Sequence, residues 1–158
     1  MNKLTYVTGD ILTPSAASKS VIVCHQVNCR GVMGAGLAKQ VRKIHPGVYT
    51  NYKIKCAQIQ DGIGGLGDVQ FCSCLHKYGY IIANVFGQDD FGRGRRFTDY
   101  DALRMAFTHI AEVFPNYTVR IPYKMGCGLG GGEWPAVLQI IKETLVTNNV
   151  TVEIWQLP

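Results

Sequence analysis

The stretch that decides the fold reads Cys24-His-Gln-Val-Asn-Cys-Arg-Gly-Val-Met-Gly-Ala-Gly-Leu-Ala-Lys39. The β-branched run of residues 21–23 leads into it and predicts a buried strand. Three glycines follow Asn28, and apolar residues at helical spacing from Leu37 to Ile44 then predict an amphipathic helix. The helix is expected to end just before Pro46, because proline disfavours the α conformation in the residue that precedes it.

A strand, a glycine loop and a helix N-terminus together form an anion site, because free backbone N–H groups and the positive end of the helix dipole face the loop. The stretch is neither a Walker loop nor the dinucleotide G-x-G-x-x-G motif. The alternative is an ordinary strand-to-helix turn. A second glycine loop, Met125-Gly-Cys-Gly-Leu-Gly-Gly-Gly132, precedes another expected helix and favours a ligand site.

Length and composition indicate one globular domain over residues 1–158. Hydrophobic residues make up 47% and charged residues 17% of the chain. No apolar run approaches the roughly 20 residues that span a membrane. The chain starts directly with a strand pattern and without a signal-peptide pattern, so a cytoplasmic location is expected. The protein is also expected to be a monomer.

The formal net charge of +5 favours anionic ligands. Arg93, Arg95 and Arg96 cluster in one loop, which points either to nucleic acid as a further partner or to a solvated charged face. The six cysteines include no Cys-x-x-Cys pair, so reduced thiols are expected, with no metal and no cofactor.

Strand and helix patterns alternate along most of the chain. Strands are expected at 4–9, 20–26, 68–75, 80–86, 117–122 and 151–157, and helices after residues 36, 47, 99 and 133. The third and fourth strands form a hairpin around Lys77-Tyr-Gly79. This order predicts a three-layer α/β/α fold with a mixed central sheet. Ligands bind such sheets at the carboxyl ends of parallel strands, where both glycine loops would lie beside Asp10 and residues 88–96.

At this point the chain resembles the macrodomain family, whose fold binds ADP-ribose. Three motifs carry the resemblance: Val7-Thr-Gly-Asp-Ile-Leu12, Asn28-Cys-Arg-Gly-Val-Met-Gly-Ala-Gly-Leu-Ala38 and Gly126-Cys-Gly-Leu-Gly-Gly-Gly132. The motifs stand in the family's order, and the resemblance covers essentially the whole chain.

The resemblance implies a role for each part of the site. Asp10 and Ile11 would hold the adenine, the first loop would surround the distal ribose and one phosphate, and the second loop would wrap the diphosphate. The partner would be ADP-ribose or an ADP-ribosylated macromolecule. The implied ligand-binding residues are Asp10, Ile11, Asn28, Gly31, Val32, Met33, Gly34, Ala35, Gly36, Phe86, Gln88, Gly126, Cys127, Gly128, Leu129, Gly130 and Gly131.

Two subgroups of the family are similar to this chain, the ADP-ribose 1''-phosphate phosphatases and the terminal ADP-ribose glycohydrolases. His25 stands where the phosphatase form carries a histidine proposed to act in catalysis. The glycohydrolases use a lysine, matched here by Gln88 or Gly87, and an aspartate, matched by Gly130. Glutamine forms no Schiff base and glycine supplies no general base.

Two functions therefore remain open. The first is a hydrolase that acts at the distal ribose, on ADP-ribose 1''-phosphate or on an ADP-ribosyl ester of protein or nucleic acid. Its candidate catalytic residues are His25, Asp89 and Asp90. The second is a non-catalytic reader of ADP-ribose, favoured by the loss of both glycohydrolase residues.

Overall fold

The computed structural model describes residues 3–158, which fold around one sheet of six strands. The strands follow the order β1-β6-β5-β2-β4-β3, and only β3 runs antiparallel to its neighbour β4. They are β1 (Leu4–Thr8), β2 (Val21–Val27), β3 (Val69–Cys74), β4 (Tyr80–Phe86), β5 (Thr118–Pro122) and β6 (Thr151–Gln156).

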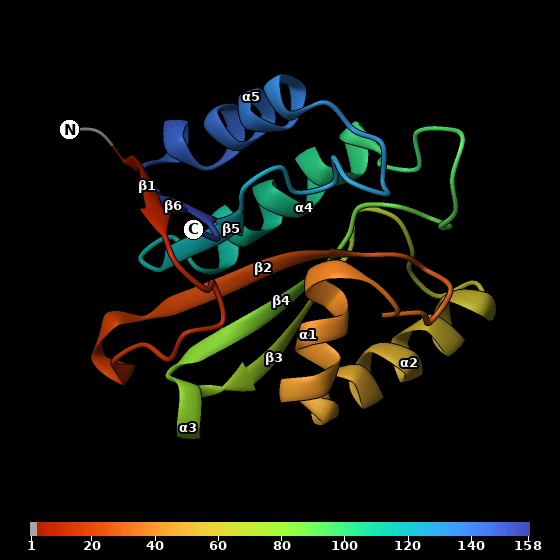
Figure 1. Cartoon of the computed structure of the whole chain (residues 1–158), viewed down its shortest axis with the longest axis horizontal. Coiled ribbons are helices and arrows are strands. Elements are labelled where there is room, and N and C mark those ends of the chain that lie inside the picture. The colour runs from red at the N-terminus through yellow and green to blue at the C-terminus, as the bar shows by residue number, and fades with distance from the viewer. Residues whose placement is uncertain (1–2) are drawn as a thin grey trace.

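Helices cover both faces of this sheet (Figure 1). On one face lie α1 (Gly36–Ile44) and α2 (Pro46–Gln60), and on the other α4 (Tyr100–Val113) and α5 (Trp134–Thr144). The short elements are η1 (Ala17–Lys19), α3 (Leu75–Tyr78) and η2 (Val146–Asn148). The expected three-layer α/β/α fold is confirmed. Within residues 3–158, no helix is long and apolar enough to cross a membrane.

The two central strands explain why helices are needed on both faces. Every residue of β4 is buried, and so is every residue of β2 except Gln26. Alternate residues of β2 point to opposite sides: Ile22 packs toward α4 and α5, and Val23 toward α1 and α2. Parallel strands with such continuous apolar runs are stable only when both faces are covered.

The expected elements are present, with shifts at their ends. The first strand stops at Thr8, before the expected Gly9-Asp10 end, because Asp10 turns the chain by accepting a hydrogen bond from the Leu12 N–H. The second helix starts at Pro46, since proline fits the first helical turn. The tight connection expected at Lys77-Tyr-Gly79 is the short helix α3, which ends at Gly79 with a φ of 73°.

Candidate functional site

Three adjoining hollows form one groove along the carboxyl edge of the sheet. The Asp10 section, of about 570 Å³, lies at the ends of β1 and β6. The glycine-loop section, of about 270 Å³, lies between α1 and the loop after β5. The Asn28 section, of about 400 Å³, is lined by the loops after β2 and β4. Tyr123 lines the first two sections, and Gln26 and Gln88 line the last two, so the groove is continuous.

Asp10 is exposed and lines its section together with Ile11. Its Oδ1 accepts a hydrogen bond of 2.9 Å from the Leu12 N–H, and no group among residues 3–158 bonds to Oδ2. The loop is held from below by Arg120 of β5, whose buried guanidinium donates to the carbonyls of Ile11 at 3.0 Å and Thr13 at 2.7 Å. Asp10 therefore has one oxygen committed to the turn and one available to a ligand.

The N-terminus of α1 opens into the groove. Ala35 caps this helix with its backbone only, and no side chain bonds to the N–H groups of the first turn. Ala35 and Gly36 both line the groove, so the first-turn amides face a ligand without a Cβ between Gly36 and the hollow. These unpaired donors and the helix dipole favour an anion at this point.

The loop after β5 faces α1 from the other side of the groove. Within the part of the chain that the structure describes, no acceptor takes the N–H groups of Gly128, Leu129 or Gly130. All three residues line the glycine-loop section. Gly126, with a φ of 75°, is in the left-handed region and turns the loop toward the groove. The groove is thus bordered by unpaired amides on both sides.

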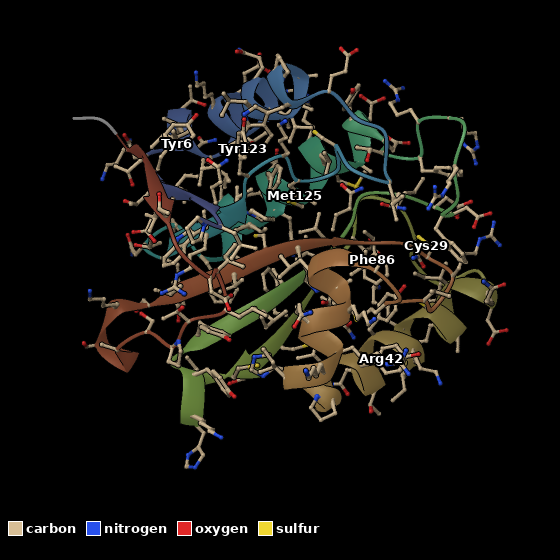
Figure 2. The ribbon with its side chains drawn as sticks, in the orientation of Figure 1. Tyr6, Cys29, Arg42, Phe86, Tyr123 and Met125 are labelled. Carbon is tan, nitrogen blue, oxygen red and sulfur yellow. The ribbon has the colours of Figure 1, made fainter. Side chains whose placement is uncertain are left out.

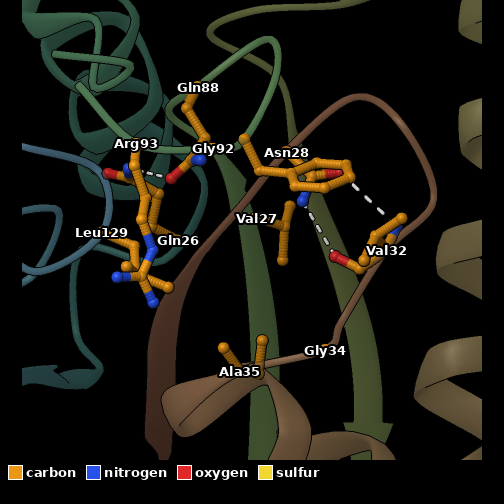
Figure 3. A pocket seen from close by; sticks show the side chains of 12 residues that line it. Gln26, Val27, Asn28, Val32, Gly34, Ala35, Gln88, Gly92, Arg93 and Leu129 are labelled. Carbon is orange, nitrogen blue, oxygen red and sulfur yellow. Dashed lines mark hydrogen bonds between the residues drawn. The ribbon is translucent and has the colours of Figure 1, made fainter. Parts of the chain in front are cut away.

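Asn28 lines the third section but also holds its own loop. Its Nδ2 donates to the Val32 carbonyl at 2.8 Å (Figure 3). Its Oδ1 accepts from the Arg30 N–H at 2.9 Å and from the Tyr52 hydroxyl at 2.8 Å. Asn28 therefore caps its own loop through these bonds. Its position beside Gly34 also places its side chain at the wall of the Asn28 section.

Gln88 lies at the junction of the last two sections. Its Oε1 accepts a hydrogen bond of 2.7 Å from Gln26 Nε2 (Figure 3), and its own Nε2 donates to the Asp90 carbonyl at 2.8 Å. Of the two positions that could match the glycohydrolase lysine, only Gln88 lines the groove. A Cβ at Gly87 would lie 2.6 Å from Gln26 Oε1, too close for a side chain.

The carboxylates of Asp89 and Asp90 are paired with a cation from the opposite loop. Arg30 Nη2 lies 3.1 Å from Asp89 Oδ2 and 3.8 Å from Asp90 Oδ2. Neither aspartate lines any of the three sections. The three side chains are 41–58% exposed, so these ion pairs join the two loops at the surface and add little to stability.

His25 is buried on the α1 side of β2, behind the glycine-loop section. Its Nε2 donates to Asn84 Oδ1, and Asn84 is oriented for this by donating its own Nδ2 to Gln70. The His25 Nδ1 is buried with no partner in the described chain. Burial lowers the pKa of His25 to about 4, so the ring is neutral at pH 7.

Several expected ligand residues lie elsewhere. Phe86 is a correction: it has no exposed surface and stacks on Tyr52 with ring centroids 5.9 Å apart, because it is the last inward-facing residue of β4 (Figure 2). Met33 is likewise fully buried and packs in that same cluster. In all, five expected ligand residues do not line the groove: Gly31, Met33, Phe86, Cys127 and Gly131.

The aromatic residues that line the Asp10 section were not predicted from the sequence as site residues. Tyr123 directly follows β5 and packs edge-on against Trp134 with centroids 5.3 Å apart (Figure 2). Trp155 of β6 lines the same section, with the Arg120 guanidinium 4.5 Å from its ring centroid. Both stand at carboxyl ends of predicted strands, and that position was the available signal. Flat apolar walls of this kind suit a planar ring.

The thiols follow the sequence expectation. All six cysteines are free. Burial raises the pKa of Cys29 to about 11, and burial also raises the pKa of Cys127, so both remain protonated at pH 7. Protonated thiols are poor nucleophiles. Within residues 3–158, no group of three His, Cys, Asp or Glu side chains could hold a metal ion.

Comparison with known proteins gives relatives with the same fold. No family model matches the chain. A macrodomain protein from Streptomyces coelicolor has a TM-score of 0.80 at 26% identity, covering 97% of this chain and 98% of that one. The chain has the macrodomain fold.

Three further proteins are similar to this chain. A Bacteroides thetaiotaomicron protein of unknown function has a TM-score of 0.83 at 27% identity, with 96% of both chains covered. An ADP-ribose 1''-phosphate phosphatase from Meyerozyma guilliermondii is 27% identical over 96% of this chain and 99% of its own length. Thermosipho africanus DarTG, solved in complex with ADP-ribose, has a TM-score of 0.78 at 22% identity over 98% of this chain and 41% of that one.

The packing around Gly130 explains why no aspartate stands at this position. A Cβ at Gly130 would overlap the Thr98 hydroxyl and lie 2.8 Å from the Gly126 carbonyl oxygen. The Gly130 carbonyl is also committed, since it accepts from the N–H groups of Phe97 at 2.8 Å and Thr98 at 2.9 Å. An acidic side chain at this position therefore requires a different arrangement of the loop.

Proposed function

We propose that this macrodomain binds ADP-ribose in the groove and hydrolyses a bond at its distal ribose. One observation carries the proposal: unpaired backbone amides border the groove on both sides, at the N-terminus of α1 and at Gly128, Leu129 and Gly130. A diphosphate between them would receive hydrogen bonds from both loops and the favourable field of the helix dipole.

The ends of the groove fit the two ends of the ligand. In the Asp10 section, which Tyr123 and Trp155 also line, Asp10 Oδ2 would accept a hydrogen bond from the adenine amino group. In the Asn28 section, the distal ribose would meet the amide side chains of Asn28 and Gln88. Amide groups both donate and accept, as ribose hydroxyls do.

The relatives support both parts of the proposal. The Meyerozyma relative is named as an ADP-ribose 1''-phosphate phosphatase and matches this chain along nearly its whole length. The Thermosipho protein was solved with ADP-ribose bound. We therefore favour ADP-ribose 1''-phosphate as substrate, with an ADP-ribosyl ester as the second candidate.

Hydrolysis needs a held water and a group that accepts its proton. Positioning the distal ribose against the loops would supply much of the rate enhancement. His25, neutral at pH 7, keeps a free Nδ1 lone pair on the α1 side of β2, and Asp89 and Asp90 would become available if Arg30 released them. His25→Gln, Asp89→Asn and Asp90→Asn test these roles one at a time.

A non-catalytic reader is the second candidate. It is favoured by Gly130, whose surroundings exclude an aspartate, and by Gln88, whose side chain is committed to Gln26 and the Asp90 carbonyl. A reader and a hydrolase would share the same groove. They differ only in whether a proton acceptor reaches the distal ribose.

The deciding experiment follows product release. The protein is incubated with ADP-ribose 1''-phosphate and, separately, with an ADP-ribosylated protein and an ADP-ribosylated oligonucleotide. Release of inorganic phosphate or of free ADP-ribose, lost on blocking the groove with the Gly36→Trp variant, supports the hydrolase. Unchanged substrates together with measurable ADP-ribose binding support the reader. Steep weakening of oligonucleotide binding with salt would indicate that the basic loop contacts phosphates.

A further inference from the structure

The three arginines of the loop after β4 differ in where their guanidinium groups lie. Arg95 lies over the Phe97 ring, 3.9 Å from its centroid, and Arg96 lies over the Tyr100 ring, 4.3 Å from its centroid. Arg93 has no ring contact, ion pair or hydrogen bond with any described residue. It lines the Asn28 section instead, alongside Gln26 and Leu129 (Figure 3).

Arg93 is also the one charged side chain among the residues that line this section. The others are apolar residues, glycine and the amides Gln26, Asn28 and Gln88. The nearest carboxylates in sequence, Asp89 and Asp90, are paired with Arg30 and do not line the section. The positive charge of Arg93 is therefore not neutralised by the wall of the groove.

We propose that Arg93 is a specificity-determining residue that recognises a phosphate attached to the distal ribose. The inference rests on the proposed function, since it requires ADP-ribose to occupy the groove with its distal ribose in the Asn28 section. A guanidinium presents two parallel N–H donors that match two phosphate oxygens. The distal ribose of unmodified ADP-ribose is neutral and offers Arg93 no charge, so the residue discriminates between the two ligands.

The phosphate could come from two sources with the same chemistry. One is a terminal phosphate monoester, as in ADP-ribose 1''-phosphate, and the other is a phosphodiester that joins the distal ribose to a nucleic acid end. A monoester has a second pKa of about 6 and gains charge between pH 5 and 7.5. A diester keeps one charge throughout this range. The pH dependence of binding therefore distinguishes them.

The test is a calorimetric comparison of ADP-ribose with ADP-ribose 1''-phosphate as ligands. The titrations are made at low temperature, so that the ligand is not hydrolysed while binding is measured. The wild type is expected to bind the phosphorylated ligand about tenfold more tightly, the size of one charge-assisted hydrogen-bonding interaction. Arg93→Gln should remove this preference and leave ADP-ribose affinity within about twofold. Arg95→Gln, the matched control from the same loop, should keep the full preference because its guanidinium is on Phe97.

Two results would overturn the inference while leaving the proposed function intact: a wild type that binds both ligands equally, or a preference that survives in Arg93→Gln. If Arg95→Gln lost the preference as fully as Arg93→Gln, the preference would come from the overall positive charge of the loop. That result would also overturn the inference about Arg93. Absence of any ADP-ribose binding by the wild type is a separate outcome, which contradicts the proposed function itself. The pH dependence then identifies the source of the phosphate. A preference for ADP-ribose 1''-phosphate that rises from pH 5 to 7.5 indicates recognition of the monoester dianion. An ADP-ribose phosphodiester that binds as tightly as ADP-ribose 1''-phosphate, with no dependence on pH, indicates a nucleic acid end.

Discussion

The amide nitrogen of Gln26 donates a hydrogen bond of 2.8 Å to the Thr98 hydroxyl, 72 residues further along the chain. That hydroxyl in turn donates to the Gly126 carbonyl at 2.7 Å, and the same amide nitrogen reaches Gln88 Oε1 at 2.7 Å. One side chain of β2 therefore connects the loop after β4 with the glycine loop after β5. These contacts fix the width of the groove between its second and third sections.

Replacing Thr98 with valine should loosen this junction. The Gly126 carbonyl would keep the Gly132 N–H but lose the Thr98 hydroxyl as a donor, and the Gln26 amide would lose one of its acceptors, with a cost of about 0.5–1.5 kcal/mol in the free energy of unfolding. ADP-ribose affinity should fall as well, because the amides of the second loop lose their fixed position. Urea unfolding and calorimetry measure the two effects.

The matched control for this change is Thr108→Val. The Thr108 hydroxyl bonds to the Arg104 carbonyl within α4 and is exposed, so its loss should alter stability by a few tenths of a kcal/mol and leave binding unchanged. Equal stability of Thr98→Val and Thr108→Val would contradict the proposed role of the junction.

Gly130→Ala should destabilise the protein, because its Cβ would overlap the Thr98 hydroxyl and approach the Gly126 carbonyl oxygen to 2.8 Å. Overpacking of this kind costs about 1–3 kcal/mol. Gly128→Ala serves as the control, since a Cβ there meets nothing within 4 Å. Urea midpoints of the two variants give the comparison, and a stable Gly130→Ala would show that the loop tolerates a side chain.

The protonation of His25 should make stability depend on pH. Its pKa is lowered to about 4 in the folded protein, against about 6.5 when unfolded, so the unfolded chain binds more protons between these values. Stability therefore falls as pH drops through this window, and His25 should account for roughly 2 kcal/mol lost between pH 7 and pH 5. Urea unfolding at both pH values measures this loss.

Comparison with variants assigns that loss to the residue. His25→Gln should lose less stability than the wild type between pH 7 and pH 5, although His45, whose pKa is also lowered by burial, still contributes. His76→Gln, with an exposed side chain on α3, should keep the wild-type dependence. A pH dependence that is the same in all three proteins would place the titration outside His25.

Local patterns were sufficient to predict the fold and the two glycine loops. The apolar run of β4, the Asp99 cap of α4 and the proline that starts α2 each act over a few residues, and each element is present. The position of Asp10 beside the groove also followed from its place at the end of a parallel strand.

Contacts between distant residues could not be predicted in the same way. Arg120 donates hydrogen bonds to the carbonyls of Ile11 and Thr13, more than a hundred residues away in sequence. Arg30 forms ion pairs with Asp89, 59 residues away, and with its neighbour Asp90. The expectation for Phe86 was wrong for a related reason. Which end-of-strand side chain faces the groove depends on the register of β4 and on the position of Tyr52, and neither is encoded locally.

The most direct test of the central claim is calorimetric titration of ADP-ribose into the wild type and Asp10→Asn. An asparagine can keep the hydrogen bond to the Leu12 N–H through its oxygen but then presents an NH₂ donor to the adenine amino group. The account predicts saturable one-to-one binding by the wild type, and an affinity at least about tenfold lower for Asp10→Asn at unchanged stability. Equal affinities of the two proteins would contradict the assignment of the adenine to the Asp10 section, and no binding by the wild type would contradict the function proposed for the groove.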